Sequence, residues 1–280
     1  MTAPDAKAIA ERRARFRALH ERGCFIIPNS WDAGTTHYFS TLGFKAVASS
    51  SAGYAWTLAQ KDGALTLDQT LAHLRDLVAA SDLPVNADFV DGFGATPADV
   101  AANVTRAIDT GIAGISIEDS YPPSQRAAHA EPLRPVSEGV ERIKAARAAI
   151  DKSGQDVMLV GRAENFVQGR PDIDDAVARL KAYSEAGADI LFAPGISTPE
   201  QIKAVVDAVA PKPVSLLVGG PSPLSLKDYE AMGVRRISVG GTLARVAWGA
   251  TMRASELLAQ GNFTGMEGPP GAAVNKLMHG

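Results

Sequence analysis

The chain has 280 residues, a formal net charge of −3, 46 % hydrophobic residues and 21 % charged residues. This composition is typical of a globular domain, and the near-neutral charge gives no footprint for nucleic acid or an anionic membrane. No apolar run reaches the roughly 18 residues of a membrane span, and the N-terminus lacks the apolar core of a signal peptide. The single cysteine, Cys24, excludes an internal disulfide and a cysteine-based metal cluster. We expect a cytoplasmic enzyme with one domain over residues 1–280.

Hydrophobic periodicity predicts an N-terminal helix within residues 1–22, from Pro4 to Arg22, and then alternating strands and helices. The expected strands are Cys24 to Pro28, Ala46 to Ser49, Val85 to Phe89, Ile112 to Ile117, Val157 to Arg162, Ala188 to Ala193, Val214 to Val218 and Val234 to Val239. The expected helices are Ala33 to Leu42, Leu67 to Ala80, Ala98 to Thr110, Val136 to Ile150, Ile173 to Ala186, Pro199 to Ala208, Leu224 to Met232 and Thr242 to Ala259.

About eight strand–helix units in one chain predict an α/β fold of the (β/α)₈ TIM-barrel class. The strands are continuous apolar runs, as parallel strands covered on both faces require. Gly43, Gly111, Gly187 and Gly233 fall where a helix ends and the next strand begins. The segment 262–280 is rich in glycine and proline, and we expect it to form a C-terminal tail outside the core.

Charged side chains follow three successive predicted strands. Asp88 ends one strand, Glu118 follows the next, and Arg162 ends the one after it; Asp62 lies in an earlier loop. In a barrel, the carboxyl ends of the strands meet at one face, and Mg²⁺ takes oxygen ligands such as these carboxylates. The sequence therefore predicts a metal site of Asp62, Asp88 and Glu118. The alternative is that these acids cap helices or pair with Arg162.

Other segments at the same barrel face suggest anion binding. Small residues at Ser49 to Gly53 could turn backbone N–H groups towards a carboxylate, or could form a plain Ser/Gly loop. Gly219-Gly220 and Gly240-Gly241 end the last two strands, where many barrels bind phosphate, although tight strand–helix turns are the favoured explanation of these glycines. Trp31 follows the first strand and could line the pocket. The loop from Ser120 to Pro135 is placed to act as a lid.

Several motifs, in their order and spacing, resemble those of a known superfamily. They are Asn29-Ser30-Trp31-Asp32-Ala33, Ser49-Ser50-Ser51-Ala52-Gly53, Lys61-Asp62-Gly63, Ala87-Asp88 with Gly92-Phe93-Gly94, Ile117-Glu118-Asp119, and Gly161-Arg162-Ala163-Glu164. The chain resembles the isocitrate lyase/phosphoenolpyruvate mutase superfamily, and its phosphonomutase-like branch in particular. The likeness extends from about Gly23 to Gly261. It implies a barrel whose last helix is swapped between the subunits of a homodimer or homotetramer.

The resemblance also implies a cofactor, a substrate and roles for named residues. Asp88 and Glu118 would hold Mg²⁺, with Asp62 acting through a water, and a small 2-oxo acid or its enolate would bind beside the ion. Arg162 would stabilise the enolate oxygen. The catalytic residues would be Arg162, Glu118 and Asp62, and the substrate-binding residues would be Ser50, Ser51 and Ala52 through their amides, Trp31 and Arg162.

This sequence departs from the superfamily pattern at several positions. The loop after Glu118-Asp119 lacks the cysteine of the lyases and the lysine and asparagine of the phosphoenolpyruvate mutases. Most relatives carry an acid where Val90 stands, so either Asp91 substitutes for it or the ion is held more loosely. Ala48 replaces a common aromatic, which makes a roomier pocket.

These departures favour decarboxylation of an oxaloacetate-like substrate, because decarboxylation through an enolate needs an electron sink rather than a protein nucleophile. Cleavage of a substituted malate is a close variant that needs a base, and Tyr54, Tyr121 and His129 are the candidates. A phosphonopyruvate-acting phosphonomutase and a non-catalytic 2-oxo-acid-binding protein are the alternatives. Cys24, at the start of the first strand, is expected to be inert.

Overall fold

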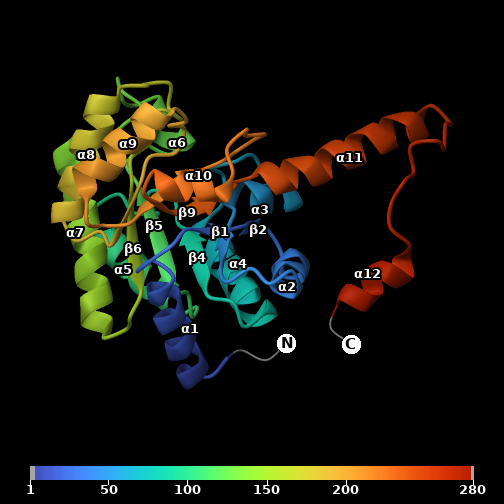
Figure 1. The fold of residues 1–280 in the computed structure, drawn as a ribbon, viewed down its shortest axis with the longest axis horizontal. Coiled ribbons are helices and arrows are strands. Elements are labelled where there is room, and N and C mark those ends of the chain that lie inside the picture. Colours follow the sequence, from blue (N-terminus) through green and yellow to red (C-terminus); the bar gives the residue numbers. More distant parts are fainter. Residues whose placement is uncertain (1–3, 279–280) are drawn as a thin grey trace.

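The computed structural model describes residues 4–278 and contains one sheet of nine parallel strands (Figure 1). The strand order is β1-β9-β8-β7-β6-β5-β4-β3-β2, and a register shift at Val214/Ser215 interrupts the pairing of β8 with β9. Their bounds are β1 Phe25–Ile27, β2 Asn29–Ser30, β3 Val47–Ser49, β4 Val85–Asp88, β5 Gly114–Glu118, β6 Met158–Arg162, β7 Ile190–Phe192, β8 Val214–Leu217 and β9 Val234–Ser238.

Eight of the nine strands correspond to the predicted ones; the additional strand, β2, follows the predicted first strand directly after Pro28. Proline has no N–H to donate to the ladder. β1 pairs with β9 on one side, and β2 pairs with β3 on the other. The sheet therefore closes into a barrel, as the sequence predicts.

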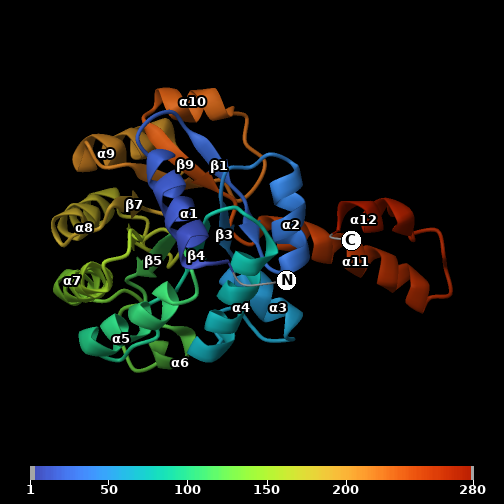
Figure 2. The ribbon, with the colours of Figure 1, turned by 90° about the horizontal axis from the view of Figure 1, so that it is seen from below.

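Helices surround the barrel (Figure 2). All eight predicted barrel helices form, with bounds within three residues of the prediction. The helices described are α1 Ala6–Ala18, α2 Ala33–Thr41, α3 Ser51–Thr57, α4 Leu67–Ala80, α5 Pro97–Ile108, α6 Pro123–Arg126, α7 Val136–Ser153, α8 Ile173–Glu185, α9 Pro199–Val209, α10 Leu226–Ala231, α11 Thr242–Ala259 and α12 Gly271–Leu277.

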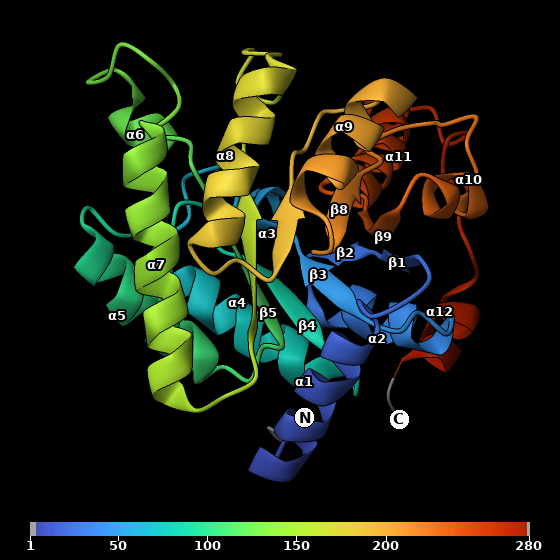
Figure 3. The same cartoon turned by 60° about the vertical axis from the view of Figure 1, so that its left-hand side comes forward.

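Helix α1 closes the end of the barrel opposite α6 (Figure 3). It is shorter than the predicted span, and residues 1–3 lie outside the described part of the chain. Phe16 on α1 is fully buried and packs with inward-facing barrel residues such as Ile27 and Val160. Gly114 on β5 makes room for it, since a Cβ there would come within 2.7 Å of the Phe16 ring. This end of the barrel is therefore filled, and only the other end is open to a ligand.

Three short helices differ from the sequence-based expectations. The Ser/Gly loop expected at 49–53 instead begins α3, because the Ser50 hydroxyl accepts a hydrogen bond from the Gly53 N–H and caps the helix. The loop from Ser120 to Pro135 contains α6. The C-terminal tail contains α12, which buries no side chain, as expected of a segment outside the core; residues 279–280 are not described.

Helix α11 projects away from the barrel, and the chain then turns back, so that α12 lies below α11 in the view of Figure 1. Of its 18 residues only Ala244 is buried. Val246, Trp248 and Met252 are exposed by 63 %, 46 % and 54 %, although all three are apolar. In the described part of the chain, the helices are all too short or too polar to cross a membrane.

Candidate active site

The open end of the barrel brings together the charged residues that the sequence places at strand ends. Asp88 is the last residue of β4, and its Oδ2 accepts hydrogen bonds from the Ser51 N–H (3.1 Å) and hydroxyl (2.7 Å). Its Oδ1 lies 3.3 Å from Nη1 of Arg162, the last residue of β6. Ser51 therefore ties the start of α3 to the end of β4.

Glu118 completes the pairing around Arg162. It ends β5 directly beside Arg162 in the ladder, and its Oε2 lies 3.4 Å from Arg162 Nη1. Glu164, two residues beyond Arg162, pairs with its Nε and is almost fully buried. Three carboxylates thus share one guanidinium, and we refer to Asp88, Glu118, Glu164 and Arg162 as the acidic cluster.

The crowding of carboxylates around Arg162 shifts the pKa values of the groups at this site. Burial raises the pKa of Glu118 to about 8, and the charges of Glu164 and Asp88 add to the rise against the opposing effect of Arg162. Burial and the charge of Asp88 raise the pKa of Asp62. For Arg162, Glu164, Glu118 and Asp88 raise the pKa further than burial lowers it. Carboxyl groups therefore outnumber the single guanidinium group in the acidic cluster, and their surroundings oppose their ionisation.

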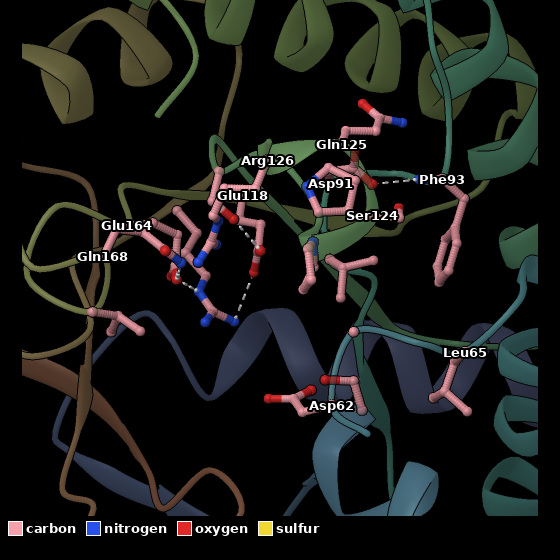
Figure 4. Close-up of a pocket in the computed structure, with 18 of the residues that line it drawn as sticks. Asp62, Leu65, Asp91, Phe93, Glu118, Ser124, Gln125, Arg126, Glu164 and Gln168 are labelled. Atoms are coloured by element: carbon pink, nitrogen blue, oxygen red, sulfur yellow. Dashed lines mark hydrogen bonds and ion pairs between the residues drawn. The ribbon is translucent and has the colours of Figure 1, made fainter. Parts of the chain in front are cut away.

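Two cavities meet at the acidic cluster. The larger, about 520 Å³, lies between the cluster and the loop from Ser120 to Pro135 (Figure 4). The smaller, about 190 Å³, extends into the barrel interior. Both are lined by Ser51, Asp62, Arg162 and Val167. Figure 4 shows Asp62 set apart from Glu118 and Glu164, towards another wall of the larger cavity.

The loop from Ser120 to Pro135 covers the larger cavity, which is the position the lid prediction requires. Its base is fixed by a bridge between Ser120 and Leu133, and α6 within it lines the cavity with Ser124, Gln125 and Arg126. Tyr121 and His129 stack on each other with ring centres 3.5 Å apart, and neither lines a cavity.

Asp91, the acid next to Val90, is already paired with two arginines. Its Oδ2 lies 2.9 Å from Arg134 Nη2 and 3.1 Å from Arg142 Nη2, and the side chain is buried. Its Oδ1 accepts the Phe93 N–H at 3.1 Å. Asp91 is therefore engaged in holding the base of the lid, and the hypothesis that it serves the metal is not supported.

The amides expected to bind a carboxylate are only partly available. The Ser50 N–H donates to the Ser30 carbonyl at 3.0 Å, and the Ser51 N–H donates to Asp88. Ser50, Ser51 and Ala52 all line the smaller cavity. Trp31 lines neither cavity. Its side chain packs against Gly53, where an added Cβ would lie only 2.8 Å from the Trp31 Cβ.

Two of the glycines expected to bind phosphate, Gly219 and Gly240, make hydrogen bonds within the protein. The amides of Val239 and Gly240 donate to the Asn29 side chain at 3.0 and 2.8 Å. The Gly219 carbonyl accepts from Thr242 and Arg245. A phosphate site at these turns therefore gains no support. Cys24 is half-buried and away from both cavities, and burial raises its pKa to about 11, so it stays a neutral thiol.

Sequence reasoning missed Arg236, whose side chain enters the barrel and lines the smaller cavity. The sequence does indicate an arginine inside the barrel. Arg235 and Arg236 interrupt an apolar strand, and successive strand residues point to opposite faces. One of the pair must therefore face the interior.

Comparison with known proteins agrees with this geometry. Residues 16–259 match the family model described as phosphoenolpyruvate phosphomutase. The chain is 30 % identical over 260 residues to an oxaloacetate decarboxylase of Paraburkholderia xenovorans (strain LB400), covering 91 % of this chain and 84 % of that one. It is 32 % identical to a 2,3-dimethylmalate lyase of Eubacterium barkeri, covering 77 % and 74 %.

A solved structure of a candidate lyase/mutase from Burkholderia cenocepacia J2315 superimposes with a TM-score of 0.89 and 44 % identity, covering 96 % of both chains. The fold and the ordered motifs thus agree with the resemblance found in the sequence. The chain belongs to the phosphoenolpyruvate phosphomutase family and is a carbon–carbon lyase of the isocitrate lyase/phosphoenolpyruvate mutase superfamily.

Proposed function

We propose that this chain is a Mg²⁺-dependent enzyme that cleaves a small 2-oxo acid through an enolate, with decarboxylation of an oxaloacetate-like substrate as its reaction. The observation that carries the proposal is the acidic cluster, in which three carboxylates share Arg162 at the open end of the barrel. The similarity to an oxaloacetate decarboxylase and a 2,3-dimethylmalate lyase supports the substrate class.

The residues at this site fit a magnesium ion. Asp88 and Glu118 would hold it, with Asp62 acting through a water, because Mg²⁺ is commonly held by one or two carboxylates and keeps several waters. In residues 4–278 no group of three or more His, Cys, Asp or Glu side chains is gathered closely enough to hold a metal by itself. The donor chemistry still fits, since a divalent cation would offset the charge that raises the pKa of Glu118 and Asp62.

When bound, Mg²⁺ would supply a Lewis acid for the 2-oxo group. Arg162 would donate hydrogen bonds to the oxygen on which negative charge develops. The bond between C3 and the departing carboxylate breaks, its electron pair enters the enolate, and CO₂ leaves. A proton from solvent then converts the enolate of pyruvate to pyruvate, so no protein nucleophile is needed.

The surroundings of the cavity favour decarboxylation over cleavage of a substituted malate. Malate cleavage must remove a proton from an alcohol, and this step needs a base close to the substrate. Tyr54, Tyr121 and His129, the candidates from the sequence, line neither cavity. Tyr54 instead stacks on His73 with ring centres 3.9 Å apart.

The proposal includes a homodimer or homotetramer in which α11 is exchanged between subunits. The exposed Trp248 and Met252 lie on α11 in a groove with Trp56, and this apolar surface is large for a helix in water. A second copy of the chain is the partner that would cover it. Sedimentation of the purified protein tests this, and a stable monomer would contradict it.

The function is tested by a pyruvate-release assay with Mg²⁺ or EDTA. The substrates are oxaloacetate, phosphonopyruvate, 2-methylisocitrate and alkylmalates. Pyruvate released from oxaloacetate well above the metal-only background, and lost with EDTA, is the expected result. Activity on phosphonopyruvate alone, dependent on Gln125 or Arg126, would replace the proposal with a phosphonomutase. Binding of 2-oxo acids without any turnover would replace it with a 2-oxo-acid-binding protein.

A further inference from the structure

Arg236 is a buried cation without an acidic partner. Its side chain projects from β9 into the barrel and is only 3 % exposed. Its Nε donates to the Ser215 hydroxyl and its Nη1 to the Asn86 side-chain carbonyl, both at 3.1 Å. None of the described residues accepts a hydrogen bond from Nη2. Burial lowers the pKa of Arg236 to about 9, and no carboxylate offsets this effect.

A second buried arginine, Arg13 on α1, shows what a structural arginine looks like in this protein. It is 2 % exposed and also bonds to neutral acceptors. All three of its nitrogens are used: Nε donates to the Ile112 carbonyl, Nη2 to the Ile108 carbonyl, and Nη1 to Gln155. Arg13 borders none of the cavities around the active site, whereas Arg236 lines the smaller one.

The smaller cavity joins Arg236 to the acidic cluster. Arg236 and Asn86 line it one layer below the strand ends, and Asp88 and Arg162 line it at the strand ends. Ser116 and Ser238 add hydroxyl groups to the wall. A ligand in this cavity would therefore have a cation beneath it and the proposed metal ligands above and beside it.

Burying an arginine without a counter-charge is costly, and such a charge is normally paired. A carboxylate bound in the smaller cavity would supply the missing charge and the missing acceptor for Nη2. We propose that Arg236 binds the carboxylate adjacent to the 2-oxo group of the substrate, and that it thereby fixes which end of the substrate enters the barrel. This inference rests on the proposed function, because it assigns an orientation within the same site.

The orientation follows from the reaction and from the two cavity sizes. A carboxylate that departs as CO₂ loses its charge, so a cation bound to it would stabilise the substrate more than the transition state. Arg236 is therefore suited to the carboxylate that stays in the product. The smaller cavity of about 190 Å³ would hold the carboxylate that stays in the product. The larger cavity of about 520 Å³ would hold the rest of the substrate, under the lid.

The inference is tested by measuring the binding of oxalate and pyruvate with Mg²⁺ by titration calorimetry. Arg236→Met should weaken both ligands by about tenfold or more, the usual effect of removing a charged hydrogen-bond partner. Arg236→Lys, which keeps the charge, should restore part of the affinity. Arg13→Met is the matched control: it removes a buried arginine elsewhere and should leave both affinities unchanged, whatever its effect on melting temperature.

A second variant keeps Arg236 but supplies its missing counter-charge from within the protein. Asn86→Asp places a carboxylate where the Asn86 side-chain oxygen now lies 3.1 Å from Arg236 Nη1. It should weaken oxalate and pyruvate as Arg236→Met does. In steady-state assays, both variants should raise KM for every accepted 2-oxo acid more than they lower kcat.

The outcomes separate this inference from the proposed function. Unchanged affinities in folded Arg236→Met would overturn the inference while leaving the proposed function intact. Arg236-dependent binding of pyruvate without turnover of any substrate would overturn the decarboxylase proposal and support the inference. Failure of the wild-type protein to bind either ligand, with or without Mg²⁺, would overturn both.

Discussion

Asp88 at the end of β4 and Asp91 in the turn after it lie three residues apart, yet their surroundings differ in charge balance. Asp91 belongs to a lid-base cluster with Arg134, Arg142 and Glu138, in which two carboxylates face two guanidinium groups. Asp88 belongs to the acidic cluster, in which three carboxylates share one. The balanced cluster can be explained by structure alone. Under the proposed function, a further cation completes the unbalanced cluster, so the difference separates the structural acid from the proposed metal ligand.

The turn itself separates the two aspartates. Val90 and Phe93 have φ angles of +39° and +55°, a left-handed conformation that is uncommon for residues other than glycine. The turn leaves Asp88 at the strand end and sends Asp91 towards Arg134 and Arg142. Backbone strain of this kind is often retained near functional sites.

The largest expected effect is the loss of activity in Asp88→Asn. This change removes a proposed metal ligand while keeping the shape of the side chain, and Mg²⁺-dependent pyruvate release should fall to the rate without enzyme. The matched control is Asp91→Asn, which should retain Mg²⁺-dependent turnover at temperatures where it is folded. A fully active Asp88→Asn enzyme would contradict the metal assignment.

The second effect is on the free energy of unfolding, and here Asp91→Asn should lose more than Asp88→Asn. Asp91→Asn leaves two buried arginines without their shared carboxylate, and breaking a buried pair typically costs about 3–5 kcal/mol. Asp88→Asn removes a charge from a cluster with excess carboxylates and should cost less than about 1 kcal/mol. Urea denaturation in EDTA measures both. Equal losses would show that Asp88 is as structural as Asp91.

The strands, most helices and the strand-end charges could be predicted because each is encoded locally, by an apolar run, a 3.6-residue period or a glycine at a joint. The lid-base cluster could not be predicted in this way. Its partners lie 43 and 51 residues from Asp91, and the sequence does not show which arginine will reach which acid. From the sequence alone Asp91 is therefore a candidate metal ligand, because its two arginine partners cannot be identified there.

Helix α3 and the smaller cavity show the same limit. Ser50 at the start of a Ser/Gly segment is compatible with a loop or a cap, and only the Gly53 N–H that reaches its hydroxyl decides for a helix. Arg236 lies in a strand whose apolar pattern is clear, but its partner Asn86 is 150 residues away. Fold signals are local, whereas the charge balance of a site is a property of the assembled barrel.

A third prediction adds charge to the acidic cluster. Val90 lines the larger cavity, at the position where the superfamily resemblance implies an acid. Val90→Asp should tighten Mg²⁺ binding by about tenfold, the scale on which outer-sphere groups tune metal sites. Val90→Asn is the control, because it suits the left-handed backbone equally well without adding charge. Equal Mg²⁺ affinities of the two variants in calorimetric titrations would show that the ion lies elsewhere.

The smallest expected effect compares one glutamate from each cluster. Glu138 pairs with Arg134 at the lid base, and its side chain is 33 % exposed, so Glu138→Gln should cost about 0.5–1 kcal/mol. Burial and the charges of Glu164 and Asp88 raise the pKa of Glu118, which means that its surroundings oppose its negative charge. Glu118→Gln should therefore leave the free energy of unfolding in EDTA unchanged or higher. A larger loss in Glu118→Gln than in Glu138→Gln would mean that Arg162 already balances the acidic cluster, and the argument for a missing cation would fail.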